Sequence, residues 1–105
     1  MALARTINTD IAMRNDRLRS SIPCISKPDL FVFTRGIADM SIDDQVEIMT
    51  IVKEYTAFND DNDPWGEHDF GCFYYNGIKM FWKIDDYNGV DGLRLVLTIL
   101  LADEY

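Results

Sequence analysis

The side chains best suited to chemistry in this 105-residue chain lie in one acidic loop, residues 59–69. The loop holds five carboxylates and the only histidine: Asp60, Asp61, Asp63, Glu67, Asp69 and His68. An EF-hand calcium loop starting at Asp61 is excluded, because its twelfth position is Cys72, where a bidentate glutamate is needed. A metal-dependent hydrolase or nuclease that uses the loop remains an alternative to a solvated loop closed by local side-chain-to-backbone turns.

Glu67, His68 and Asp69 resemble catalytic residues in a row, but their adjacency argues against that role. Side chains alternate in direction along an extended chain, so His68 is expected to point away from both neighbours. The register of the hairpin that follows places His68 opposite Asp85, and we predict a cross-strand pair between them. No nucleophile stands at a suitable spacing, and no phosphate-loop or zinc-protease motif occurs. We therefore expect no enzymatic activity, catalytic residue, bound metal or cofactor.

A second group of carboxylates lies on a helix predicted at residues 41–58. Asp43, Glu47 and Glu54 fall within about 40° of one another around the helix axis. Their axial separations are about 6 Å and 10 Å. Such a row either populates a solvated face or imitates the phosphates that a basic groove binds. The predicted partner-binding residues are Asp43, Glu47, Glu54, Asp60, Asp61, Asp63 and Glu67.

The charge of the chain is unevenly distributed. The formal net charge is −8, from 18 acidic and 10 basic residues. Residues 1–36 hold six bases and three acids (+3), whereas residues 37–105 hold four bases and fifteen acids (−11). A negative field of this size disfavours direct contact with DNA or RNA, since such binding depends on basic residues at the phosphates. It favours a partner with a basic protein surface.

Two helices and one strand are predicted before the loop. Residues 4–18 have the spacing of an amphipathic helix, with Arg14, Arg17 and Arg19 on its polar side. Residues 30–34 are rich in aromatic and β-branched side chains, which predicts a short strand. Ser41 is expected to cap the start of the next helix, with Asp44 three residues later as in a capping box. The stripe of that helix predicted to face the core is Ile42, Val46, Met49, Val52 and Tyr55.

Residues 70–75 and 78–84 are predicted to form a β-hairpin, because Asn76-Gly77 favours a two-residue type I′ turn. The residue numbers of two paired positions across the hairpin then add up to 153. Gly71 therefore faces Trp82 and leaves room for its indole. The residues assigned to the core are Phe73, Tyr75, Ile78, Met80, Trp82 and Ile84. The other face is half apolar and flanked by Lys79 and Lys83. It is covered by a helix or offered to a partner, including a homodimer through Phe70, Cys72, Tyr74 and Phe81.

A last helix is expected from about residue 91 to 104, apolar around nearly its whole circumference. The predicted fold class is α+β, in one domain spanning residues 1–105. Three helices surround a small antiparallel sheet of about three strands in the order α-β-α-β-β-α. Two distant cysteines, with no signal peptide or membrane-length apolar segment, favour a cytoplasmic protein with reduced thiols.

Three motifs carry a resemblance to a family of small bacterial proteins known as a domain of unknown function. They are NDPWGEHDFG at residues 62–71, FWKID at residues 81–85 and LTILLADEY at residues 97–105, and the likeness runs from Phe31 onward. The resemblance implies a fold but no activity. Trp65 and Asp86 stand where the family more often has a tyrosine and an aromatic residue.

In size and charge the chain also resembles phage-encoded anti-CRISPR proteins, in particular small acidic inhibitors of type I-C interference complexes. This resemblance implies a protein of a phage or mobile element that docks on a basic nucleic-acid-binding subunit of the effector complex and blocks target DNA binding. No residue match assigns inhibitory residues, so the predicted site depends on the spacing of the acids alone. A homodimeric regulatory or interaction domain is a further alternative.

Overall fold

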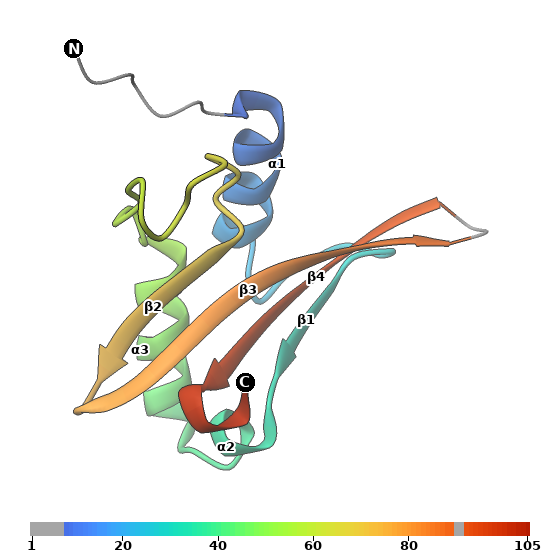
Figure 1. Ribbon diagram of the computed structural model, residues 1–105. Coiled ribbons are helices and arrows are strands. Elements are labelled where there is room, and N and C mark those ends of the chain that lie inside the picture. Colours follow the sequence, from blue (N-terminus) through green and yellow to red (C-terminus); the bar gives the residue numbers. More distant parts are fainter. Residues whose placement is uncertain (1–7, 90–91) are drawn as a thin grey trace.

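The computed structural model describes residues 8–89 and 92–105 (Figure 1). Within them the elements are α1 (Thr9–Ser20), β1 (Leu30–Phe33), α2 (Arg35–Ala38), α3 (Ile42–Lys53), β2 (Phe70–Tyr75), β3 (Ile78–Gly89), β4 (Gly92–Leu101) and the 3₁₀ turn η1 (Ala102–Glu104). The α+β class is confirmed, but the predicted element order is not. The short α2 was not expected, and α3 ends at Lys53 rather than near residue 58.

The strands form one mixed sheet in the order β1-β4-β3-β2. β3 is antiparallel to both β2 and β4, whereas β1 is parallel to β4. The described sheet therefore has four strands rather than about three, and it is not purely antiparallel.

The predicted final helix is wrong, because β4 occupies most of that segment. A continuous apolar run suits a central strand as well as a buried helix, and periodicity alone does not separate the two. β4 lies between β1 and β3, where Leu95, Leu97 and Ile99 point into the core. Only Ala102–Glu104 turns helically, as η1.

The β2–β3 hairpin has the predicted register throughout, from Tyr75 opposite Ile78 to Phe70 opposite Lys83. Asn76 and Gly77 both adopt positive φ angles, 49° and 77°, as a type I′ turn requires. Of the predicted core residues, Ile78 is exposed, because it stands beside the turn at the end of the sheet, and Tyr75 is only half-buried.

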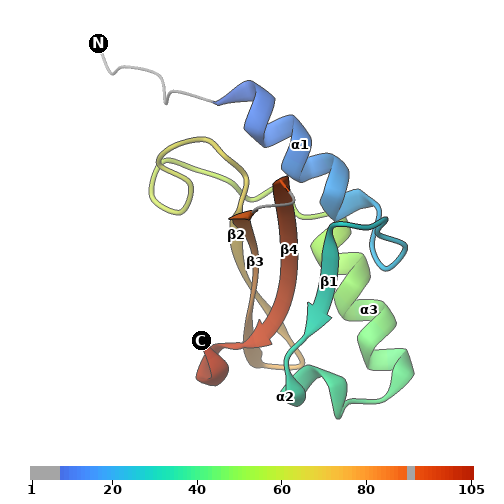
Figure 2. The same ribbon diagram turned by 90° about the vertical axis from the view of Figure 1, so that its right-hand side faces the viewer.

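Helices α1 and α3 pack on one face of the sheet, and the other face carries η1 at one end (Figure 2). The core between helices and sheet includes Ile37, Ile48, Val52, Trp82 and Leu97, all completely buried. None of the helices among residues 8–89 and 92–105 is both long and apolar enough to cross a membrane.

Helix α3 begins as predicted, with the Ser41 hydroxyl accepting a hydrogen bond from the Asp44 amide at 3.1 Å. Its buried stripe differs from the prediction, because Ile48 points inward while Ile42 and Val46 are exposed. Gln45 lies on the inward side of α3 with Ile48, and its side-chain nitrogen is 3.0–3.2 Å from the carbonyl oxygens of Ile37, Ala38 and Met40 around the end of α2. This contact holds the Gln45 side of α3 against α2.

Helix α1 begins at Thr9, and the predicted turn at residues 4–7 lies outside the described residues. Arg19 does not lie on a polar outer face, as predicted, but is 4% exposed.

The Gly71→Ala substitution tests the close packing of the hairpin on the core. A β-carbon at this position would collide with the buried indole of Trp82 and with the ring of Tyr55. Overpacking of this kind costs about 1–3 kcal/mol of unfolding free energy. Gly89→Ala is the matched control, because a β-carbon there meets nothing within 4 Å. Urea denaturation is expected to separate the two variants, and equal stabilities would contradict this packing.

Candidate functional site

The acidic ridge consists of Asp43 and Glu47 on the outer side of α3 and of Glu54, the residue that caps the end of the helix. All three residues are exposed, whereas Ile48 and Val52 on the opposite side of the helix are completely buried. No ion pair joins a ridge carboxylate to a basic side chain among residues 8–89 and 92–105. The ridge therefore presents three carboxylates to solvent along α3 and at its end.

Tyr75, at the end of β2, fixes part of this surface. Its hydroxyl lies 2.6 Å from Asp44 Oδ1 and 2.9 Å from Glu47 Oε2. The bond from Tyr75, with a smaller contribution from Ser41, lowers the pKa of Asp44, while Asp44, burial and Glu47 together raise the pKa of Tyr75. The phenol thus restrains Glu47 and keeps Asp44 ionised. The predicted hairpin placed Tyr75 in the core and gave no sign of this contact.

Two apolar side chains accompany the ridge. Ile42 and Val46 are 76% and 51% exposed and lie on the same outward half of α3 as Asp43 and Glu47. Apolar anchors surrounded by charge are typical of protein-binding surfaces. We call the acidic ridge together with Ile42 and Val46 the α3 surface.

The loop after α3 is divided between surface and interior. Asp60 and Asp61 are exposed. The Asn59 side-chain oxygen accepts hydrogen bonds from the amides of Asp61 and Asn62, the local turn that was one of the two predicted alternatives.

Asp63 is only 3% exposed, so it does not share the surface of the ridge. Its Oδ1 accepts hydrogen bonds from the amides of Glu67 and His68 at 3.0 and 3.2 Å.

Glu67 is half-buried, and its carbonyl accepts a hydrogen bond from the Asn15 side chain at 2.9 Å. Of the seven predicted partner-binding residues, the structure thus places five on the surface: Asp43, Glu47, Glu54, Asp60 and Asp61. It places Asp63 in the interior and Glu67 between the two.

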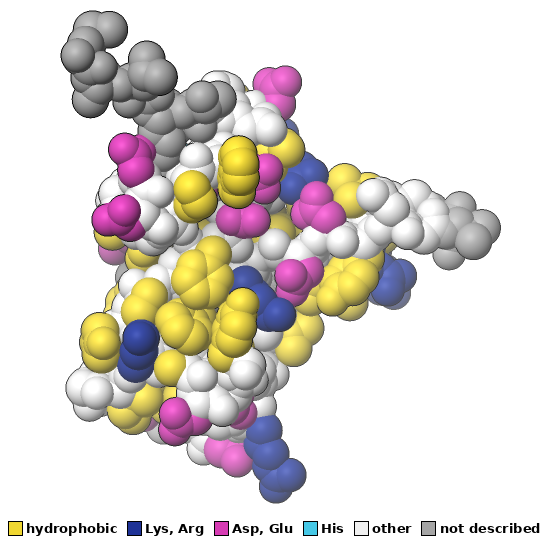
Figure 3. All heavy atoms as spheres, in the orientation of Figure 1, with side chains coloured by type: hydrophobic (Ala, Val, Ile, Leu, Met, Phe, Trp, Pro, Cys, Tyr) yellow, Lys and Arg dark blue, Asp and Glu magenta, His cyan; other side chains and the backbone are white. Residues whose placement is uncertain are grey.

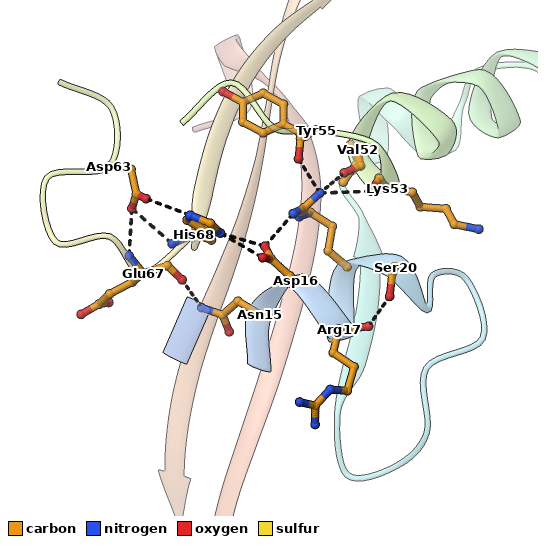
Figure 4. Close-up of polar contacts among 11 residues, drawn as sticks. Asn15, Asp16, Arg17, Ser20, Val52, Lys53, Tyr55, Asp63, Glu67 and His68 are labelled. Atoms are coloured by element: carbon orange, nitrogen blue, oxygen red, sulfur yellow. Dashed lines mark hydrogen bonds and ion pairs between the residues drawn. The ribbon is translucent and has the colours of Figure 1, made fainter. Parts of the chain in front are cut away.

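His68 does not pair with Asp85, as predicted. The hairpin ladder begins at Phe70, and His68 has a φ of 53°, which turns its ring out of the strand direction. Its Nδ1 lies 3.0 Å from Asp16 and its Nε2 lies 3.7 Å from Asp63 (Figure 4). Its ring also stacks on Phe58. Both ring nitrogens face carboxylates of the protein itself, so the ring connects α1 to the loop.

Arg19 completes this connection from α1. Its Nη1 donates to the carbonyls of Val52 and Tyr55 at 2.8 and 2.9 Å, and its Nη2 bonds Asp16 at 2.8 Å. The guanidinium also lies over the Trp82 ring, 5.0 Å from its centroid. A cation at the last carbonyls of α3 satisfies acceptors that the helix itself leaves open. Sequence periodicity missed this role, because arginine is ordinarily assigned to a polar face.

These contacts connect the loop to α1. No cluster of three or more histidine, cysteine or acidic side chains suited to hold a metal occurs among the described residues.

Asp69 lies at the end of the loop, and burial is the main cause that raises the pKa of its carboxyl group. Its carbonyl accepts a hydrogen bond from the Ile84 amide, at the point where the loop joins the sheet.

The Arg19→Met substitution tests whether α1 holds the end of α3. Methionine fills similar space but removes every donor, which leaves buried carbonyls without partners and is expected to cost about 2–4 kcal/mol of unfolding free energy. Arg17→Met, on the exposed side of the same helical turn, is the control and should change stability by less than about 0.5 kcal/mol. Chemical denaturation of both variants is the measurement. A stable Arg19→Met protein would show that the bonds from Arg19 are dispensable.

Comparison with known proteins gives one match. Residues 33–95 match the family described as "Protein of unknown function (DUF3768)". No curated protein and no solved structure matches the chain. The motifs at residues 62–71 and 81–85 lie inside the matched segment, and the motif at residues 97–105 lies beyond it. Since the match covers more than half of the 105 residues, the chain belongs to the family of proteins of unknown function DUF3768.

Proposed function

We propose that this protein is a non-enzymatic binding protein whose α3 surface docks on a basic, nucleic-acid-binding protein. The observation that carries the proposal is the acidic ridge, three exposed carboxylates along α3 and at its end, without a basic partner among the described residues. Asp60 and Asp61 extend the acidic surface beyond the end of α3.

The spacing of the ridge suits a groove that ordinarily holds phosphates. Asp43 and Glu47 are separated by about 6 Å along the helix axis, and Glu47 and Glu54 by about 10 Å. Phosphates on one strand of DNA advance by about 3.4 Å per step along the axis, so these intervals are about two and three steps. A basic groove thus meets negative charges at intervals close to those of its natural ligand.

The apolar part of the α3 surface favours a protein partner over general attraction to cations. Exposed charges by themselves contribute about 0–1 kcal/mol per pair. Ile42 and Val46 add apolar area that becomes buried only against a complementary surface. Charge then speeds and orients the encounter, and the apolar anchors supply affinity.

The resemblance to type I-C anti-CRISPR proteins supplies the most specific partner, a nucleic-acid-binding subunit of a type I CRISPR effector complex. Under the proposal the α3 surface occupies the basic surface of that subunit and prevents target DNA from binding. Such a protein acts in the bacterial cytoplasm, where the effector complex acts.

Neutralising the ridge tests the proposal directly. The variant Asp43→Asn, Glu47→Gln, Glu54→Gln is expected to bind the effector complex at least about tenfold more weakly at low salt, with a shallower salt dependence, because fewer charges attract the partner. The control Asp10→Asn, Asp39→Asn, Asp103→Asn removes the same charge from exposed residues outside the ridge. Binding and protection against target DNA binding are measured at several salt concentrations. Equal loss in both variants, or none in the ridge variant, would contradict the proposal.

A further inference from the structure

The face of the sheet opposite α1 and α3 lacks a helical layer among the described residues (Figure 2). We call it the open face. The register places Phe70, Cys72 and Tyr74 of β2 on this face together with Lys79, Phe81 and Lys83 of β3. The face thus has the predicted half-apolar composition, and no helix of the described residues covers it.

An aromatic cluster lies at the centre of the open face. The rings of Phe70 and Phe81 are 5.1 Å apart, and Tyr105 stands with its edge against Phe81 at 5.5 Å. Tyr105 is itself 77% exposed, so it covers the phenylalanines only in part. Figure 3 shows hydrophobic side chains gathered over this part of the molecule, with basic side chains among them.

A groove extends the apolar surface across β4. One hollow of about 380 Å³ is lined by Tyr105, Leu100 and Tyr87, and a second of about 510 Å³ by Tyr87, Val96 and Leu30. Tyr87 and Val96 line both hollows, so the two are adjacent. Together they extend the surface from the C-terminus toward the projecting ends of β3 and β4.

The area of the open face suits a stable interface. Tyr74, Tyr87 and Tyr105 are 65%, 56% and 77% exposed. With ~200 Å² for a whole tyrosine side chain, these three expose about 400 Å². That is about half of the ~800 Å² that each partner buries in a standard interface, before the aliphatic residues are counted.

The charge of the open face indicates the kind of partner. Lys79, Lys83 and Arg94 are offset on it by Asp85 and Glu104, so the face is close to neutral in a chain of net charge −8. Lys83 and Asp85 already pair at 3.2 Å. A near-neutral face with both signs of charge is compatible with the self-complementarity that the interface of a twofold dimer requires.

We propose that two copies of this chain associate through their open faces, sheet against sheet, as a twofold-symmetric dimer. Sheets pack face to face at about 10 Å when their side chains interdigitate, and homodimer interfaces are the more apolar class. Elsewhere on the surface two molecules of charge −8 repel each other, so this face offers the contact with the least repulsion. The α3 surfaces remain outside, because α3 covers the opposite side of the sheet (Figure 2).

Sedimentation velocity of the whole protein over a range of concentrations tests the dimer. The expected result is a concentration-dependent dimer whose affinity increases with salt, because salt screens the repulsion between like-charged molecules. A monomer at every concentration and salt would overturn the proposal. Binding through the acidic ridge has the opposite salt dependence, so failure of the dimer and failure of the proposed function are distinguishable.

Two variants locate the interface. The double variant Tyr74→Arg, Tyr87→Arg puts positive charge on two exposed side chains of the open face and is expected to weaken dimerisation at least about tenfold. The control Ile42→Arg, Val46→Arg makes the same change at two exposed residues of α3 and should leave the dimer intact. Thermal unfolding verifies that both variants are folded. A dimer unaffected by the first variant, or broken only by the second, would overturn the proposed interface.

Discussion

The burial of one guanidinium group, that of Arg19, holds the helical layer of this protein in place. The group satisfies the carbonyls of Val52 and Tyr55 at the end of α3, bonds Asp16 and lies against Trp82 in the core. Because both helices converge on this cation, α3 is fixed at one end by Arg19. At its other end, Gln45 bonds the carbonyls around α2. These two attachments hold α3 with Ile48 and Val52 inward and the acidic ridge outside.

The molecule consequently has two exposed surfaces of different character on opposite sides of one sheet. The α3 surface is acidic, with two apolar anchors, while the open face is aromatic and close to neutral. Asp43 and Glu47 stand four residues apart, and like charges at this spacing destabilise a helix by a few tenths of a kcal/mol. This repulsion opposes the helix, while the bond from Tyr75 to Glu47 and the place of Asp43 in the first turn favour it. The proposed binding role gives the repulsion a purpose.

Local features of the fold were predictable from sequence wherever backbone chemistry decides them. Asn76-Gly77 set the hairpin register, Gly71 accommodated Trp82, and Ser41 capped α3. Elements decided by tertiary contacts were not predictable. The apolar segment at Leu93–Leu101 is a strand because β1 and β3 flank it, and periodicity does not contain that information.

The candidate site was predictable only in part, for the same reason. The ridge follows from helical spacing, and the structure exposes its three residues along α3 and at its end. The burial of Asp63 and the contacts of His68 with Asp16 and Asp63 depend on the meeting of α1 with a loop about fifty residues away. Charged side chains are ordinarily expected on the surface, so the sequence pattern of α1 gave no indication that Arg19 is buried.

Carboxylate footprinting of the bound protein tests the central claim most directly. The protein is treated with a water-soluble carbodiimide and an amine, alone and in complex with its basic partner, and the modified residues are read by mass spectrometry. We expect Asp43, Glu47 and Glu54 to be modified in the free protein and protected in the complex, while Asp10 and Asp39 react equally in both. Equal modification of the ridge with and without the partner would contradict the account.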